Sequence, residues 1–254
     1  ALAPKYVVGE RSTTKQVASN GIGGKLNFTY PFTGDDYFRT FITGQGEVGI
    51  GTTNPQSKPD PFADSQLISG NFGGLNFQSG YLTSYSVNFV PNALVMASAE
   101  VSFYDQLSGE FVSEDSPAPS VGEVLNFKNA VISIIESDQP IDNFIGGSYN
   151  YTSEVRPVYL MNEKIPSSIN FGAKTVNMNF EVDNPTGTLP ITGSFARINV
   201  SLKNSNGLTK DGFLCSGVMN QRNMSSSVGD YIRQTINIVQ NETAKTVTVN
   251  GVSP

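Results

Sequence analysis

The chain has 254 residues, a formal net charge of −6, one cysteine and no histidine. Without histidine there is no Ser-His-Asp or Cys-His catalysis and no His-ligated zinc, and the general base most often used near neutral pH is missing. The acidic balance disfavours specific nucleic-acid binding, which needs a basic footprint, yet it would let a polyanion pass without adhering. No apolar run approaches the roughly 18 residues of a membrane span, and the first residues lack the apolar core of a signal peptide.

Charged residues make up only 15% of the chain, compared with roughly 25% in a typical soluble domain. Asn, Ser, Thr and Gly take their place. Ser, Thr and Asn compete with helical backbone bonding and Gly weakens it, so this mixture favours strands and turns. We therefore expect an all-β protein.

Two alternating stretches in the first half predict a pair of strands. From Tyr81 to Phe89, and again from Val95 to Phe103, apolar and polar residues alternate with the period of a strand. Pro91-Asn92 between them is a turn signal, because Pro presets φ and Asn tolerates the left-handed region. Further upstream, Gly21 to Gly24 is a loose turn that precedes a strand, so it is no phosphate-binding loop.

The second half repeats this design of short strands separated by turn residues, which is typical of sandwich or barrel domains. Pro157 interrupts one strand and indicates an edge or a bulge there. The stretches Asp60 to Ile68 and Asp138 to Ile145 are compatible with short helical turns. The predicted strands are Val131 to Ile135, Val155 to Met161, Ile169 to Val182, Phe195 to Leu202, Phe213 to Met219, Tyr231 to Val239 and Thr246 to Val249.

Composition also predicts the domain organisation. The stretch from Gly73 to Asp105 resembles that from Gly146 to Asp183 in its spacing of Gly, Tyr and Pro, which indicates a duplication. Residues 116–123 read as a stiff, Pro-containing linker between a first β domain, residues 1–115, and a second, residues 124–254.

A long aperiodic loop, residues 43–64, lies in the first domain and is rich in Gly and Pro. Loops of this length inside a compact domain are usually functional or disordered. We expect this one to contact a neighbouring molecule, with a floppy insertion as the alternative.

Few side chains are candidates for chemistry. Cys215, in Phe213-Leu214-Cys215, is expected to be a small buried apolar residue, and a single cysteine cannot form an intrachain disulfide. There is no Asp-x-Asp-x-Asp-Gly loop for calcium. Tryptophan, the residue best suited to stack on sugar rings, is also absent.

Paired carboxylates remain, since glycosidase chemistry needs only two of them, roughly 5 to 10 Å apart. Alternation places Glu181 and Asp183 on the same face of a strand, where they are either an acid pair or a wet surface. We expect a wet surface, and therefore no catalytic residue, cofactor-binding residue or metal ligand: the chain is expected not to be an enzyme. The three nominal pairs are Asp35 with Asp36, Asp138 with Asp142, and Glu181 with Asp183.

Three segments carry a resemblance to a known family. Tyr81 to Asn88, Ala97 to Phe103 and the polar ending from Ser216 to Tyr231 resemble phage tail tube proteins of the duplicated-domain, trimeric-ring type. The resemblance implies two β-sandwich or barrel-like domains whose sheets join across subunits. Trimeric rings would stack as a conduit with a negative lumen, through which DNA passes as a transient, non-specific passenger.

The same resemblance implies partners and location. The partners would be further copies of the chain and other virion tail proteins, with no membrane, and the long loop would be a stacking arm. The protein would be made in the host cytoplasm and reside in the virion. Short helices that commonly flank the sheets in this family are hard to find here. Two alternatives therefore stay open: another virion β protein of the baseplate, neck or capsid surface, and a secreted β-sandwich binding module.

Overall fold

The all-β prediction is confirmed by the computed structural model, whose described residues form strands and turns with no helical element. The described residues are 2–5, 15–18, 23–33, 36–39, 42, 68–72, 74–105, 107–110, 125, 130–134, 139–141, 143–161, 163–183, 192–203, 206, 209–225, 232–242 and 245–247. The strands are β1 (Leu2–Lys5), β2 (Lys15–Ala18), β3 (Gly24–Pro31), β4 (Ile68–Phe72), β5 (Leu75–Phe89), β6 (Met96–Phe103), β7 (Ala130–Ile134), β8 (Gln139–Ile141), β9 (Phe144–Val158), β10 (Ser168–Asp183), β11 (Phe195–Lys203), β12 (Thr209–Ser225), β13 (Arg233–Glu242) and β14 (Lys245–Val247).

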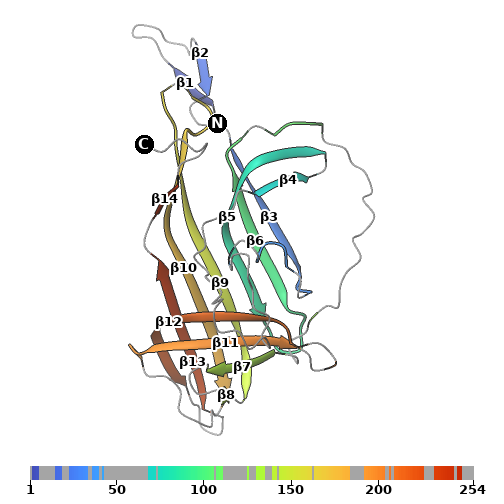
Figure 1. Ribbon diagram of the computed structural model, residues 1–254, viewed down its shortest axis with the longest axis vertical. Coiled ribbons are helices and arrows are strands. Elements are labelled where there is room, and N and C mark those ends of the chain that lie inside the picture. The colour runs from blue at the N-terminus through green and yellow to red at the C-terminus, as the bar shows by residue number, and fades with distance from the viewer. Residues whose placement is uncertain are drawn as a thin grey trace.

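Twelve of these strands form one antiparallel sheet, and β1 pairs separately with β2 (Figure 1). Ten of the twelve follow a single path in the order β3-β6-β5-β9-β10-β13-β12-β11-β7-β8. Off this path, β4 pairs with β5 and β14 pairs with β10. The two ends of the path do not meet, so the sheet is open. Strands from before and after residues 116–123 join directly where β5 pairs with β9.

The sheet folds back on itself at β12, which serves two neighbours in turn. Its first part, up to Val218, pairs with β11, and its last part, from Val218 onward, pairs with β13. A register shift between Met219 and Gln221 marks the bend, as expected where a strand passes from one layer to another. In Figure 1, β11 and β12 cross β9 and β10 near the lower end of the view. We call β3, β6, β5, β9, β10, β13 and the end of β12 the front layer, and the start of β12 with β11, β7 and β8 the back layer.

Aromatic side chains fill the space between the two layers. Phe213 in the back layer is 1% exposed. Its ring centroid lies 5.4 Å from that of Phe32, 5.7 Å from that of Phe89 and 5.1 Å from that of Tyr149. Those spacings are in the range where aromatic pairs attract one another beyond their area burial. The ring of Phe213 is therefore the centre of the core, and it depends on the fold-back of β12.

The alternation read from the sequence holds in the structure. Tyr85, Val87 and Phe89 point into the core from β5, as predicted, and every second residue from Val95 to Phe103 is buried. Tyr81, predicted on the same face as Tyr85, lies on the other face, because the register with β6 shifts between Leu82 and Ser84. The turn at Pro91 and Asn92 is present, with Asn92 at a φ of 57°.

The helical turn predicted for Asp138 to Ile145 is wrong. Gln139–Ile141 is strand β8, and Phe144 begins strand β9. Between them Asn143 has a φ of 60°, in the left-handed region that Asn tolerates. A sharp turn between two strands thus replaces the helix. Pro157, predicted at an edge or bulge, lies beyond the part of β9 that pairs with β5, so that side of the strand has no neighbour among the described strands.

Two sets of four strands share one connectivity. The order β3-β6-β5-β4 in the first half corresponds to β10-β13-β12-β11 in the second, with every neighbouring pair antiparallel. In both sets the third strand in this order is long, and only its first part pairs with the fourth. The repeat in connectivity thus matches β3 with β10, rather than the two hairpins that the sequence comparison aligned.

A turn after β3 fastens the front layer to the back layer. The Asp36 carboxylate accepts hydrogen bonds from the Tyr30 hydroxyl at 2.8 Å and the Tyr85 hydroxyl at 2.7 Å. Arg39, 5% exposed, donates to the Gly212 carbonyl, and its guanidinium carbon lies 4.4 Å from the Phe213 ring centroid. Burial, reinforced by the Asp36 charge, raises the pKa of Tyr30 and of Tyr85 well above 10.

These raised pKa values predict loss of stability in alkali. The unfolded chain releases the tyrosine protons from about pH 10 while the folded chain keeps them, so the free energy of unfolding falls as the pH rises above about 10. Tyr85→Phe removes a hydrogen bond to a carboxylate and should cost about 1.5–3 kcal/mol at pH 8. It should also flatten the alkaline decline. Urea unfolding at pH 8 and pH 11 measures both effects.

The exposed neighbour Tyr37, 58% exposed, supplies the matched control. Tyr37→Phe should change the free energy of unfolding by less than about 0.5 kcal/mol. Equal alkaline losses in the wild type and in Tyr85→Phe would contradict this account of the cluster.

Candidate assembly surfaces

The outward face of the front layer, which we call the polar face, carries mostly polar side chains. Along each strand most of the alternate residues that do not enter the core carry hydroxyl or amide groups, and the registers align them in rows across the layer. One such row runs through Thr29, Ser98, Ser86, Asn150 and Asn177. Other members of the polar face are Asn27, Ser84, Asn88, Ser148, Thr152, Thr175, Asn179, Thr235, Asn237, Gln221 and Asn223.

Hydrogen bonds between strands tie these side chains to one another. The Asn237 amide donates to the side-chain oxygens of Asn177 at 2.7 Å and Asn179 at 3.0 Å. The hydroxyls of Thr29 and Ser98 lie 3.2 Å apart. Groups that are already bonded within the sheet are held in place, so the polar face is a wettable surface with fixed side chains.

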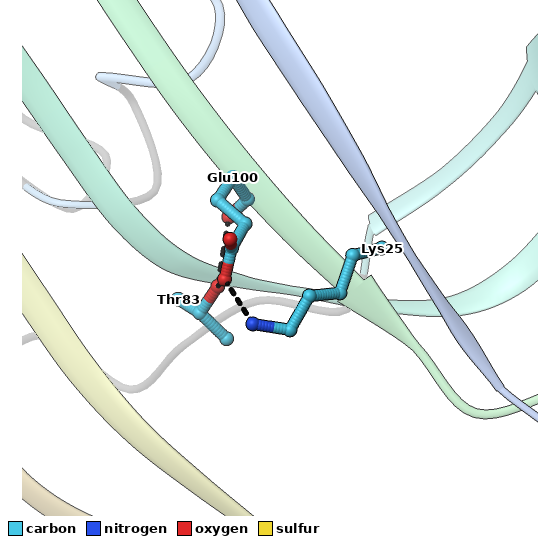
Figure 2. Close-up of polar contacts among 3 residues, drawn as sticks. All are labelled: Lys25, Thr83 and Glu100. Atoms are coloured by element: carbon cyan, nitrogen blue, oxygen red, sulfur yellow. Dashed lines mark hydrogen bonds and ion pairs between the residues drawn. The ribbon is translucent and has the colours of Figure 1, made fainter.

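The polar face carries charges of both signs, and each cation lies beside an acid. The Lys25 ammonium donates to the Glu100 carboxylate at 2.8 Å, and the Thr83 hydroxyl donates to the same carboxylate oxygen at 2.9 Å (Figure 2). The hydrogen bond from Lys25, with that from Thr83, holds the pKa of Glu100 below its ordinary value despite partial burial. Arg156 contacts Glu154 at 2.6 Å, and Arg233 is the register partner of Asp183.

The front layer ends in two open strand edges. Among the described strands, β3 pairs only with β6, and the segment of β12 from Asn220 to Ser225 pairs only with β13. Open edges present unpaired N–H and C=O groups, which makes them templates for pairing with another chain. Inside the chain the corresponding edges are covered, because β9 lies between β5 and β10.

Both open edges also expose apolar side chains on the core side of the layer. Beside β3, the Phe28 and Phe38 ring centroids lie 5.0 Å apart, and Tyr37 next to them is 58% exposed. Beside the β12 edge, Met224 is 63% exposed, and its register partner Gln234 is buried. Each edge therefore combines a polar outer side with an apolar inner side.

A third surface is the turn between β9 and β10, which we call the apolar tip. Met161 is 91% exposed, Leu160 is 58% exposed and Ile165 is 54% exposed, with Val158 and Tyr159 partly exposed beside them. So many large apolar side chains together at the end of a hairpin usually mark a contact with another molecule.

The structure places the residues that the sequence singled out in different parts of the fold. Cys215 is buried as predicted, and burial raises its pKa to about 12. Glu181 and Asp183 do share one face of β10, as predicted. Asp36 belongs to the tyrosine cluster between the layers.

Other predictions lie outside the described residues: the linker 116–123, the loop 43–64, and the carboxylates Asp35, Asp138 and Asp142. In the part of the chain that the structure describes, no three His, Cys, Asp or Glu side chains are grouped as metal ligands would be. The same residues include no helix with the length and apolar character needed to cross a bilayer.

The chain was compared with known proteins in two ways. A scan against protein-family models found no match, and a search of curated proteins found no relative.

Proposed function

We propose that this chain is a structural, non-enzymatic virion protein whose copies form rings that stack as a phage tail tube, a conduit for DNA. In this proposal the two sets of strands are the two tail-tube-type domains, and their sheets continue into those of neighbouring copies. The observation that carries it is the pair of open edges at the two ends of one amphipathic layer. Localisation to the virion follows from the same proposal.

Strand direction supports a ring. All neighbours in the front layer are antiparallel, and β3 and β12 are six places apart along it, so they point the same way. Likewise β3 and its counterpart β10 are four places apart and point the same way. Repeats that keep one direction can be related by rotation, and head-to-tail contacts form a ring when that rotation closes. Three copies would then present six equivalent sets of strands.

Side-chain chemistry at the two edges supports the same join. Asn27 and Thr29 on β3 match Gln221 and Asn223 on β12 in being polar on the outer side. On the inner side Met224 would meet the aromatic cluster beside β3. A join between copies thus continues both faces of the layer. Inside the chain the corresponding edges of β5 and β10 are joined through β9, which pairs with both.

The polar face is the surface we assign to the lumen. Its opposite side is occupied by the core and the back layer, so it is the free face of the continued sheet. Hydroxyl and amide groups, beside Lys25 and Arg156 that are held in ion pairs, offer a passing polyanion little to bind, because non-specific DNA binding depends on Lys and Arg contacts to phosphate.

Self-assembly is the first test. The purified chain should form rings or filaments with a central channel in negative-stain micrographs, and class averages of the rings should show threefold symmetry. A chain that stays monomeric at all concentrations and salt conditions would contradict the proposal and favour a β-sandwich binding module.

Charges on the β3 edge should block ring closure. Lys side chains on edge strands oppose edge pairing, so Asn27→Lys with Thr29→Lys should lower the assembled fraction by at least about tenfold, the effect of about 1.4 kcal/mol per contact. Sedimentation velocity measures that fraction. The control, Ser86→Lys with Asn88→Lys, adds the same charge to the same face on the central strand β5. Equal losses in both variants would show that charge, and not the edge, governs assembly.

The apolar tip is assigned to stacking between rings, because it lies at one end of the long β9–β10 hairpin. Leu160→Ser with Met161→Ser should leave rings intact and shorten or abolish filaments in micrographs. Thermal unfolding should stay unchanged, because both side chains are largely exposed in the single chain. Filaments of wild-type length would remove the tip from the stacking contact.

A further inference from the structure

Building on the proposed tube, we propose that Glu100, held by Thr83, masks the charge of Lys25 so that DNA moving along the polar face does not meet Lys25 as a free cation. Glu100 and Thr83 are positioning residues in this account: they act on a passing nucleic acid only through Lys25. The three side chains come from β6, β5 and β3 in turn (Figure 2).

Geometry shows that the masking is built into the sheet. Lys25 and Glu100 are diagonal neighbours on adjacent antiparallel strands, since Lys25 pairs with Ser102 and Asn27 pairs with Glu100. The Lys25 side chain is 62% exposed and the Glu100 side chain 27%, so the lysine would otherwise present its charge to the lumen. Their 2.8 Å contact instead directs the ammonium along the sheet.

A β-bulge places the third member. The pairing of β5 with β6 shifts register between Leu82 and Ser84, and Thr83 is the residue at that irregularity. Its hydroxyl donates both to the Glu100 carboxylate at 2.9 Å and to the Glu100 backbone carbonyl at 3.1 Å. Bulges commonly re-aim a side chain. This one fixes the carboxylate on the side from which Lys25 approaches.

Folding stability is a poor explanation for this arrangement, because exposed ion pairs contribute little to it. Repetition along a tube gives the pair another consequence. Duplex DNA carries one negative charge per roughly 1.7 Å, and each lysine that contacts a phosphate adds to a salt-dependent attraction. A cation left uncovered in every copy would line the whole conduit with binding sites.

Four variants separate masking from a general change of charge. Glu100→Gln uncovers Lys25, and Lys25→Gln with Glu100→Gln removes the cation as well. Thr83→Val keeps both charges but removes the hydroxyl that holds the carboxylate. The matched control is Glu110→Gln, which makes the same charge change at an exposed carboxylate outside the front layer that forms no ion pair with a described residue.

The readout is retention of fluorescent linear duplex DNA at low and high salt, measured both for the unassembled chain and for sedimented filaments. Glu100→Gln should retain at least about threefold more DNA than the wild type at low salt and lose that excess at high salt. Thr83→Val should retain an amount between that of Glu100→Gln and that of the wild type, and the double variant and Glu110→Gln should stay near the wild type.

Two results would overturn the masking. One is an equal rise in Glu100→Gln and Glu110→Gln, which would leave net charge alone responsible. The other is Glu100→Gln filaments that form normally and retain no extra DNA. If the proposed tube function is wrong, the wild-type chain will form neither rings nor filaments. The DNA comparison can still be made on the unassembled chain, so the two failures are distinguishable.

Discussion

The whole molecule depends on one strand belonging to two layers. Strand β12 leaves β11 and joins β13 within a few residues, and only a close backbone approach makes that passage possible. A Cβ atom at Gly217 would collide with the carbonyl oxygen of Val239, so glycine is required at the bend. The fold-back carries Phe213 over the front layer, where it meets aromatic rings from β5 and β9. Without it the front layer would have one solvated apolar face and no core.

The amphipathic character of the front layer follows from this packing. Because the back layer covers one side, the alternate residues on the other side are free to be polar, and they are mostly Ser, Thr and Asn. Short polar side chains of this kind fit a flat sheet and bond to one another across strands, as the Asn237 amide does.

Alternation in the sequence was sufficient to predict the elements whose two faces differ strongly. Tyr81 to Phe89 and Ile169 to Val182 are such stretches, and both are strands. The end of β12 was not predictable in this way. Asn220 to Ser225 is mostly polar and lies at an open edge, where β13 is its one neighbour among the described strands. The start of β9 was missed because its glycines and Asn150 have low strand propensity, and pairing on both sides overrides that preference.

The candidate surfaces were predictable only in part. That Glu181 and Asp183 share a face follows from the period of a strand. The contact between Lys25 and Glu100 does not, because it joins strands far apart in the sequence. Its third member, Thr83, sits at a register shift that no local pattern reveals. Residue spacing and strand connectivity also place the repeat differently. Turns and glycines recur in any β protein, so their spacing is a weak guide to a duplication. Strand order depends on which strands pair, and it matches β3 with β10.

The common direction of β3, β10 and β12 has one more consequence. A ring in which every copy points the same way has two unlike rims, and the apolar tip of each copy lies at only one of them. Stacked rings would therefore give a filament with chemically distinct ends. Such a filament can grow preferentially from one end, and it offers different surfaces to the proteins that close it at either end. A molecule threading it would enter and leave through different rims, so the proposed conduit would be directional.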